Sequence, residues 1–190
     1  MNFSKVRLVQ LIRNIDDLRS EALLKIYHDH NAAFHVAKGA KSKHHVWEGG
    51  YADHIAECLR INEITYYGIT SYLRETGFSQ ASAAIALFFH DIEKLFRYDV
   101  QYSFASDKWR ERQKETNCTW ESLKWEILEE LQQTYAFKLT EAEMLAIKYC
   151  HGEGDDYDPD KLVASPLAAH VHNCDYASAR MFPQQGKGTA

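Results

Sequence analysis

Apolar residues recur every three or four positions along most of this chain, with charged residues between them. Such spacing places apolar side chains on one face of a helix, whereas a half-buried strand alternates apolar and polar residues. No stretch shows a convincing strand alternation. The pattern therefore predicts an all-α helical bundle. The predicted helices cover 6–15, 17–27, 52–75, 79–97, 109–115, 119–135, 140–151 and 165–182.

Capping and turn residues separate these helices. Ser79 is suited to an N-cap, Thr140 opens a capping-box sequence, and Pro166 suits the first turn of the last helix. The apolar positions expected to face the core include Leu18, Ile64 and Tyr67. The segments predicted to be connections are 31–43, 99–107 and 152–160, and 184–190 is predicted to be a frayed tail.

The composition is ordinary for a soluble globular protein. The chain has 190 residues, 45% of them hydrophobic and 26% charged, which suits a single domain over 1–190 with a sizeable core. Its formal net charge of −5 gives no general attraction to nucleic acid or to anionic membranes. Any site for a polyanion must therefore be local. Lys43 and the lysines at 38 and 41 form a basic segment of that kind, with solvated loop lysines as the equal alternative.

The four cysteines and the N-terminal sequence bear on the compartment. The cysteines are widely spaced and form no Cys-x-x-Cys pair. The start of the chain lacks the apolar segment of a signal peptide, and no apolar run approaches the roughly 18 residues that span a bilayer. We therefore predict reduced thiols, a cytoplasmic location and no membrane association.

An apolar run from 83 to 89 leads directly into His90 and Asp91. The run predicts burial, and a buried His-Asp pair needs partners that offset its desolvation. Neighbouring helical positions point about 100° apart, so both side chains can reach one ion beside the helix. A metal ion is the expected partner. Further ligands must come from elsewhere, and the sequence offers His54 and Asp175.

The order of these residues resembles that of the HD-domain metal-dependent phosphohydrolase superfamily. Segment 44–54 (HHVWEGGYADH) is similar to the HHxxxGGxxxH motif of one subgroup, the YhaM-type 3′–5′ exoribonucleases. Segment 90–94 (HDIEK) resembles the HD-hydrophobic-GK motif of that subgroup, and segments 151–152, 165–166 and 172–175 follow its later pattern in order. The resemblance spans about 43–180.

The resemblance implies an HD-domain helical bundle in which four residues bind a divalent ion: His54, His90, Asp91 and Asp175. Asp175 has an alternative role in capping or bridging helices, and His172 is a candidate to orient it. Two imidazoles and two carboxylates suit Mn, Fe, Co, Ni or Zn. Such an ion lowers the pKa of bound water and polarises a phosphoryl oxygen.

Two departures from the subgroup affect the site. Where it has a His-His pair that helps to hold a second metal, this chain has Cys150 and His151. We therefore predict one tightly bound metal, with His151 free to contact substrate or to donate a proton. Glu93 replaces a glycine of the subgroup.

Several nearby residues are expected to bind substrate. Lys94 lies one helical turn after His90, where its ammonium can stabilise a phosphoryl group, with an ion pair to Glu93 or Asp91 as the alternative. Lys43, His44 and His45 are expected to bind or orient the substrate. Trp47 is expected to fill the core, and His170 to be structural or exposed.

The leading prediction is an enzyme that hydrolyses a phosphate ester or phosphodiester of a nucleotide or short oligonucleotide, with Asp91, Lys94 and His151 as catalytic residues. A long RNA is a less suitable substrate, because the all-α pattern leaves no room for the OB-type domain that grips a strand. One alternative is a degenerate HD domain that binds a nucleotide or a partner protein, which Cys150 and Glu93 favour. Another is a metal-dependent oxygenase, which Cys150 disfavours.

Overall fold

The computed structural model describes residues 3–98 and 104–182, and for 3–7 and 104–106 only the backbone. Within these ranges the chain is helical and contains no strand, which confirms the all-α prediction. The α-helices are α1 (Phe3–Arg13), α2 (Ser20–Asp29), α3 (Asn31–Val36), α4 (Gly50–Tyr72), α5 (Gln80–Phe89), α6 (Glu93–Arg97), α7 (Phe104–Thr116), α8 (Trp120–Thr134), α9 (Glu141–Lys148) and α10 (Pro166–Arg180). A short 3-10 helix covers Gly154–Asp156. The predicted tail 184–190 lies outside the described residues.

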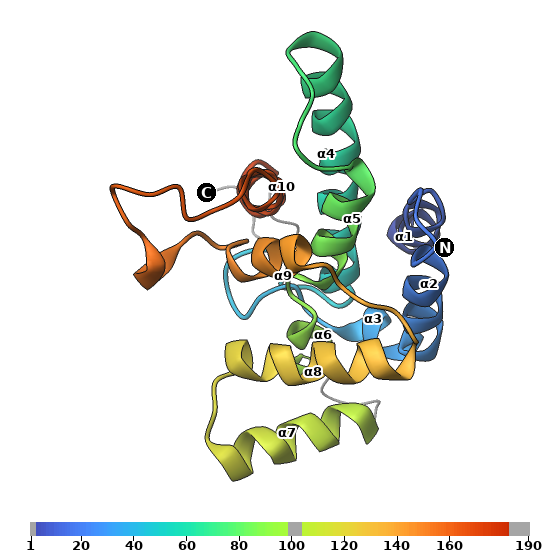
Figure 1. Ribbon diagram of the computed structural model, residues 1–190. Helices are drawn as coiled ribbons and strands as arrows, with labels where there is room; N and C mark the ends of the chain where they lie inside the picture. The colour runs from blue at the N-terminus through green and yellow to red at the C-terminus, as the bar shows by residue number, and fades with distance from the viewer. Residues whose placement is uncertain (1–2, 99–103, 183–190) are drawn as a thin grey trace, which may run out of the picture.

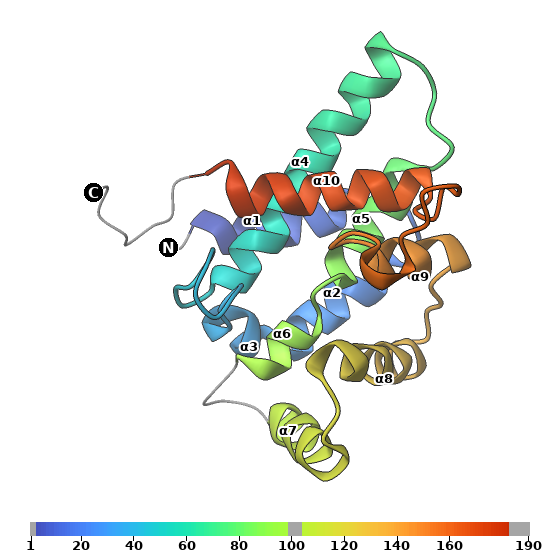
Figure 2. The same cartoon turned by 90° about the vertical axis from the view of Figure 1, so that its left-hand side faces the viewer.

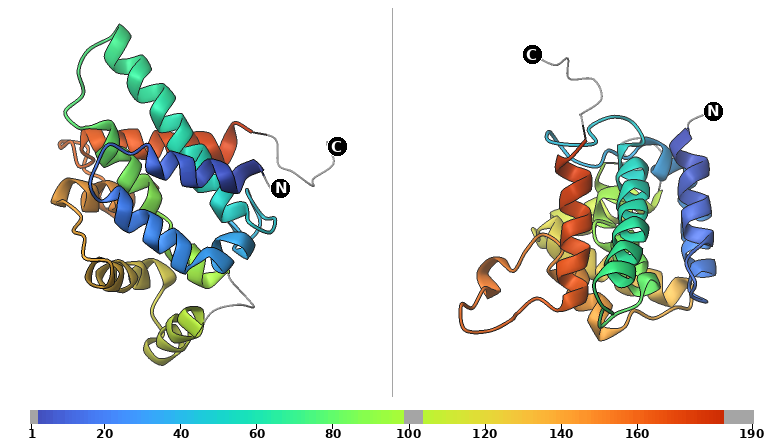
Figure 3. Two further views of the ribbon diagram at one scale, coloured as in Figure 1. Left: turned by 90° about the vertical axis from the view of Figure 1, so that its right-hand side faces the viewer. Right: turned by 90° about the horizontal axis from the view of Figure 1, so that it is seen from above.

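The apolar run of α5 forms the centre of the bundle. Every residue from 83 to 89 is at most 1% exposed, as its composition predicted. α5 packs against α4, α9 and α10, and α4 also packs against α1. Figure 1 shows α4 and α5 upright and side by side, with α10 seen end-on. Figure 2 shows α10 crossing α4, and Figure 3 shows α1 and α10 on opposite sides of α4.

α7 and α8 form an outer layer at the end of the molecule opposite the projecting end of α4 (Figure 1). Both helices pack against the short α6, and α8 turns an apolar face toward the core. That face carries Leu123, Ile127, Leu128 and Leu131, but it also carries a fully buried lysine, Lys124. The sequence had predicted this helix and its apolar contacts, and it gave no indication of the lysine.

The predicted caps are confirmed. The hydroxyl of Ser79 accepts a hydrogen bond from the amide of Ser82, and Thr140 and Glu143 form both bonds of a capping box. Ser165 caps α10 with Pro166 in its first turn. These side chains satisfy amide groups that lack a partner inside the helix, so they fix where each helix begins.

The helix predicted over 79–97 is wrong in one respect, because it is broken at residues 90–92. The amide of Lys94 donates to the carbonyl of Asp91 at 2.9 Å, and the amide of Ile92 donates to Phe89 at 3.2 Å. These bonds span three residues where an α-helix spans four. The tighter turn separates α5 from α6 and places His90 and Asp91 at the break.

Other differences are local. Residues 31–36, predicted as part of a connection, form α3, and α7 already begins at Phe104. Leu18 is 96% exposed in the turn before α2. Ile64 and Tyr67 are 63% and 58% exposed because the second half of α4 projects beyond its neighbours (Figure 1). A helical period shows which residues share a face, but it does not show where the packing partner ends.

The loop before α4 closes tightly around His45. The carbonyl of His45 accepts from the amide of Gly39 at 2.8 Å, and a Cβ on Gly50 would lie 2.1 Å from the same oxygen. Gly50 is therefore required by a close approach of two backbone segments. His45 itself has a positive φ of 49°, an uncommon conformation for a residue with a side chain. The result is a compact loop that holds His44 and His45 against the start of α4.

A charged network ties the turn before α2 to the start of α9. The guanidinium of Arg19 binds both carboxylate oxygens of Glu143, at 2.6 and 2.9 Å, and it also binds Asp17. Glu143 is fully buried, whereas the side chain of Arg19 is 19% exposed. Bidentate pairing of this kind is the strong form of an Arg–carboxylate interaction.

Arg19→Met is expected to lower the free energy of unfolding by about 2 kcal/mol, because it leaves a buried carboxylate without its counter-charge. Urea denaturation measures the loss. Arg60→Met is the matched control, because it removes an exposed ion pair with Glu63 on α4 and should change stability by less than about 1 kcal/mol. Equal effects of the two substitutions would contradict the structural role of Arg19.

Across residues 3–98 and 104–182, no helix is both long and apolar enough to cross a bilayer.

Candidate metal centre

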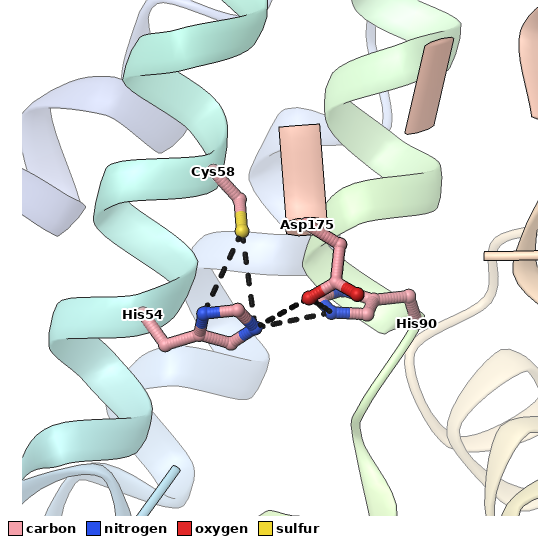
Figure 4. A group of neighbouring side chains, drawn as sticks. All are labelled: His54, Cys58, His90 and Asp175. Atoms are coloured by element: carbon pink, nitrogen blue, oxygen red, sulfur yellow. Dashed lines mark hydrogen bonds and ion pairs between the residues drawn. The ribbon is translucent and has the colours of Figure 1, made fainter. Parts of the chain in front are cut away.

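Four side chains from different parts of the chain converge at the centre of the bundle. His54 comes from the second turn of α4, His90 and Asp91 from the break after α5, and Asp175 from α10. His54, His90 and Asp91 are fully buried, and Asp175 is 8% exposed. Figure 4 shows the rings of His54 and His90 directed toward each other and toward the carboxylate of Asp175. These are the four residues predicted as metal ligands.

Five of their six mutual distances are those expected around a single ion. Nε2 of His54 lies 3.2 Å from Nε2 of His90, 3.2 Å from Oδ1 of Asp175 and 3.5 Å from Oδ2 of Asp91. Nε2 of His90 lies 3.3 Å from the same oxygen of Asp91 and 3.4 Å from that of Asp175. Ligands about 2.0–2.2 Å from an ion stand about 3.3–3.6 Å apart in a tetrahedron. Five of the six ligand-to-ligand distances are therefore close to those of a tetrahedral site.

The hydrogen bonds of the two rings fix which nitrogen faces the cluster. Nδ1 of His90 lies 2.7 Å from the carbonyl oxygen of Leu87, which can only accept, so this nitrogen carries the proton. Nδ1 of His54 lies 2.9 Å from the hydroxyl of Ser178, whose own proton goes to Glu57, so it donates as well. In neutral rings both Nε2 atoms then direct lone pairs at each other and at two carboxylates. This arrangement requires a cation, either a proton or a metal ion.

The pKa values of the cluster follow from the same electrostatics. Burial disfavours an imidazolium at His90, but the charges of Asp91 and Asp175 outweigh burial and raise the pKa of His90 to about 10. Burial also opposes ionisation of Asp175, yet its close contacts with the rings of His54 and His90 hold its pKa well below the usual range. A divalent cation would have to displace the proton that this field holds on His90.

The second carboxylate oxygen of Asp91 lies near a fifth side chain, His151. This oxygen, Oδ1 of Asp91, is buried and accepts no hydrogen bond from the described residues. It lies 3.5 Å from Nε2 of His151, which is also 3.8 Å from Oδ2 of Asp175. The side chain of His151 is 47% exposed, so it connects the cluster to the surface. The expected contact of His151 with a substrate stays a prediction.

Lys94 also contacts the cluster. Its ammonium forms an ion pair with Oδ2 of Asp91, and its side chain is 16% exposed. Burial disfavours the charged form, but the charge of Asp91 outweighs it and raises the pKa of Lys94. The ion pair was the alternative prediction for this residue, and its geometry also keeps a fixed positive charge beside the cluster.

A chain of hydrogen bonds leads from His54 to the loop that carries His44 and His45. Ser178 and His45 both donate to Oε2 of Glu57, at 2.9 and 3.0 Å. Nδ1 of His45 lies 3.1 Å from Nδ1 of His44, and the ring of His44 is 5.4 Å from that of His54. Burial and the neighbouring positive charges lower the pKa of His44 to about 4, so it is neutral near pH 7. Ser178 therefore orients His54, and the rings of His44 and His45 lie beside that of His54.

Cys58 lies one turn after His54, and its sulfur is 3.8 Å from both nitrogens of the His54 ring (Figure 4). Because the two distances are equal, the sulfur does not lie along the Nε2 lone pair of His54. Burial raises the pKa of the Cys58 thiol well above its usual value. Burial does the same for Cys150, which is fully buried. Both are therefore expected to remain thiols.

The remaining predicted residues lie further from the cluster. Lys43 is exposed in the loop before α4. Trp47 is only partly buried and donates to Asp53 at 2.7 Å. His172 contacts the carbonyl of Cys150 at 2.6 Å, so it braces the end of α9 instead of orienting Asp175. His170 is structural, with its Nε2 2.9 Å from Oδ1 of Asn62.

Sequence reasoning missed three residues that support the site. Glu57 and Ser178 each follow a predicted ligand by three positions on the same helix, His54 and Asp175 respectively, so helical spacing could have identified them. Lys124, which donates to the carbonyl of His90 at 3.2 Å, had no such signal because it is distant in sequence.

Comparison of the chain with protein-family models, curated proteins and solved structures finds no match in any of the three. Function is therefore inferred from the chemistry of the site itself.

Proposed function

We propose that this protein is a metal-dependent phosphohydrolase of the HD-domain type that acts on a phosphate ester or phosphodiester of a nucleotide or short oligonucleotide. The observation that carries the proposal is the pair of Nε2 atoms 3.2 Å apart, whose lone pairs face two buried carboxylates. The motif order of the sequence supports the HD assignment, and the converging side chains are those that the order names.

His54, His90, Asp91 and Asp175 would hold the ion. Their mixed nitrogen and oxygen set suits Mn, Fe, Co, Ni or Zn. A bound ion of this kind supplies a water of lowered pKa and a Lewis acid for a phosphoryl oxygen. The hydrogen bonds from His90 to Leu87 and from His54 to Ser178 hold the two rings in the tautomer that such a ligand needs.

The residues at the margin of the cluster would bind the substrate. The ammonium of Lys94 offers a positive charge for the phosphoryl oxygens, where charge develops during hydrolysis. His151, half exposed and in contact with Asp91, can donate a proton to the leaving oxygen. His44 lies next to His54 as a neutral hydrogen-bonding group. Lys43, exposed in the same loop, can contact a phosphate further from the reacting centre.

The test is a hydrolysis screen with the purified chain. Metal content is measured first, and the protein is then loaded separately with Mn, Co, Ni, Fe and Zn. Nucleotides, cyclic nucleotides and short oligonucleotides are offered as substrates, with Asp91→Asn as the inactive control. Metal-dependent release of phosphate or nucleotide that is lost in the variant supports the proposal. Tight nucleotide binding without turnover by the metal-loaded protein would contradict it and would favour a binding module.

Lys94→Ala is expected to lower kcat on the order of 10²-fold, because it removes a charge that faces the reacting phosphoryl group. Steady-state kinetics and thermal unfolding are measured together. Arg97→Ala, which removes an exposed cation one turn further along α6, is the control and should keep normal turnover. Normal turnover with a lowered melting temperature in Lys94→Ala would show that the lysine serves only its ion pair with Asp91.

The number of metals distinguishes two roles of His151. We expect one tightly bound equivalent in the wild type, because Cys150 leaves a single imidazole beside Oδ1 of Asp91 for a second ion. His151→Ala should then lower the rate on the order of 10²-fold and keep about one equivalent of metal. Elemental analysis of the wild type and of His151→Ala measures the number of bound metal ions. Two equivalents in the wild type that fall to one in the variant would show a dinuclear site.

A further inference from the structure

Lys124 is fully buried in the apolar face of α8. An ammonium group taken out of water is unfavourable unless it is paired and hydrogen-bonded. Its Nζ donates to the carbonyl oxygen of His90 at 3.2 Å and forms an ion pair with Glu121, whose side chain is 56% exposed. The buried carboxyl of Glu93 is close enough for its charge to act on Lys124.

The carbonyl of His90 needs this donor because of the break between α5 and α6. In a continuous α-helix the amide of Lys94 would donate to it. Here that amide donates to the carbonyl of Asp91 at 2.9 Å. The tighter turn thus leaves the buried carbonyl of His90 without its helical donor. His90 is a predicted ligand, and so is Asp91, which follows it. A buried carbonyl without a donor costs roughly 1–3 kcal/mol, and Lys124 supplies the donor.

We propose that Lys124 is a positioning residue of the metal centre, which holds the His90–Asp91 turn in the shape that directs both side chains at one ion. This inference rests on the proposed metal site and adds a residue from a different layer of the bundle. It acts through the backbone of His90, so it touches neither the ion nor the substrate.

Because Lys124 is charged, the direction in which its removal changes metal affinity tests the proposal. The positive charge of Lys124 repels a metal cation at the cluster. By Coulomb's law alone, removal of this charge would therefore strengthen metal binding. Loss of the turn geometry weakens metal binding instead. Residues that orient metal ligands typically contribute about 10–100-fold in affinity.

The experiment compares Lys124→Met with Glu121→Gln. The first keeps an unbranched side chain as far as the ε position and removes the ammonium donor. The second removes the exposed partner of Lys124 and leaves the contact with His90. Lys124→Leu, which also lacks a donor and is shorter than lysine, is the second variant and allows the same comparison if Lys124→Met does not fold. Cobalt affinity, the visible spectrum of the cobalt-loaded protein and thermal unfolding are measured for each.

Hydrogen exchange of the metal-free proteins provides a readout that needs no ion. We expect exchange of the peptide covering 88–97 to be at least about tenfold faster in Lys124→Met than in the wild type, because the freed carbonyl of the turn loses the ammonium donor of Lys124. Peptides from α1 and α2 should exchange at the wild-type rate. Equal acceleration in all peptides would show a general loss of stability and would overturn the positioning role.

With cobalt, Lys124→Met should bind about 10–100-fold more weakly and show an altered visible spectrum, whereas Glu121→Gln should match the wild type. Unchanged or tighter binding with an unchanged spectrum would overturn the proposal. Failure of the wild type to bind any metal would contradict the proposed function instead, and the exchange of 88–97 would still decide whether Lys124 holds the turn.

Discussion

Asp91→Asn is expected to abolish hydrolysis and to weaken metal binding by more than about 100-fold, which exceeds the 10–100-fold contribution typical of a residue that only orients a ligand. Asp91 is fully buried, and both of its oxygens face functional groups. Oδ2 lies near His54, His90 and Lys94, and Oδ1 lies 3.5 Å from His151. Asparagine keeps the shape but replaces one oxygen by an amide donor and removes the negative charge.

Isothermal titration and elemental analysis measure the loss of metal, and the hydrolysis assay measures the loss of turnover. Asp53→Asn is the matched control. Asp53 lies one residue before His54 and accepts a hydrogen bond from Trp47 at 2.7 Å, and it does not belong to the group of four predicted ligands. It should keep its metal and its activity. Wild-type metal content in Asp91→Asn would show that the carboxylate is not a ligand and would contradict the proposed centre.

The four converging residues were predictable because two signals complement each other. The apolar run from 83 to 89 requires burial of the His-Asp pair that follows, and it is buried. The motif order then names His54 and Asp175, which come from α4 and α10. Contacts between helices this far apart in sequence do not follow from periodicity alone. The resemblance to the HD-domain motif order is what indicated that His54 and Asp175 join the His-Asp pair.

The shape of the site was less predictable than its composition. Periodicity over 79–97 is compatible with one continuous helix, and the sequence has no proline or glycine between 79 and 97 that would mark the break. The carbonyl that the turn leaves free instead accepts a hydrogen bond from a side chain of another helix, Lys124 of α8. Such a tertiary effect overrides local helix propensity. The same limit explains Ile64, which lies on a regular helix but extends past its packing partners.

The stability of the metal-free protein is expected to fall as the pH rises toward 10. Asp91 and Asp175 raise the pKa of His90 from 6.5 to about 10, so the folded protein holds a proton that the unfolded chain releases more easily. This contribution is fully present below about pH 6.5 and is lost as the pH rises through the folded pKa. Its size is on the order of a few kcal/mol. Chemical denaturation of the metal-free protein at several pH values measures it.

Metal affinity should change in the opposite direction. A divalent ion that binds Nε2 of His90 must displace its proton, so the apparent association constant should rise by up to about tenfold per pH unit below the folded pKa. Between pH 6 and 8 the expected increase is therefore about 100-fold, measured by competition with a chelator whose own proton binding is known.

His44→Gln is the control for this dependence. The pKa of His44 is lowered to about 4 by burial and by neighbouring positive charges, so His44 does not titrate between pH 6 and 8. The variant should therefore keep the wild-type slope. An affinity independent of pH in the wild type would show that no proton leaves when the ion binds, and it would contradict the assignment of His90 as a ligand whose proton the two carboxylates hold.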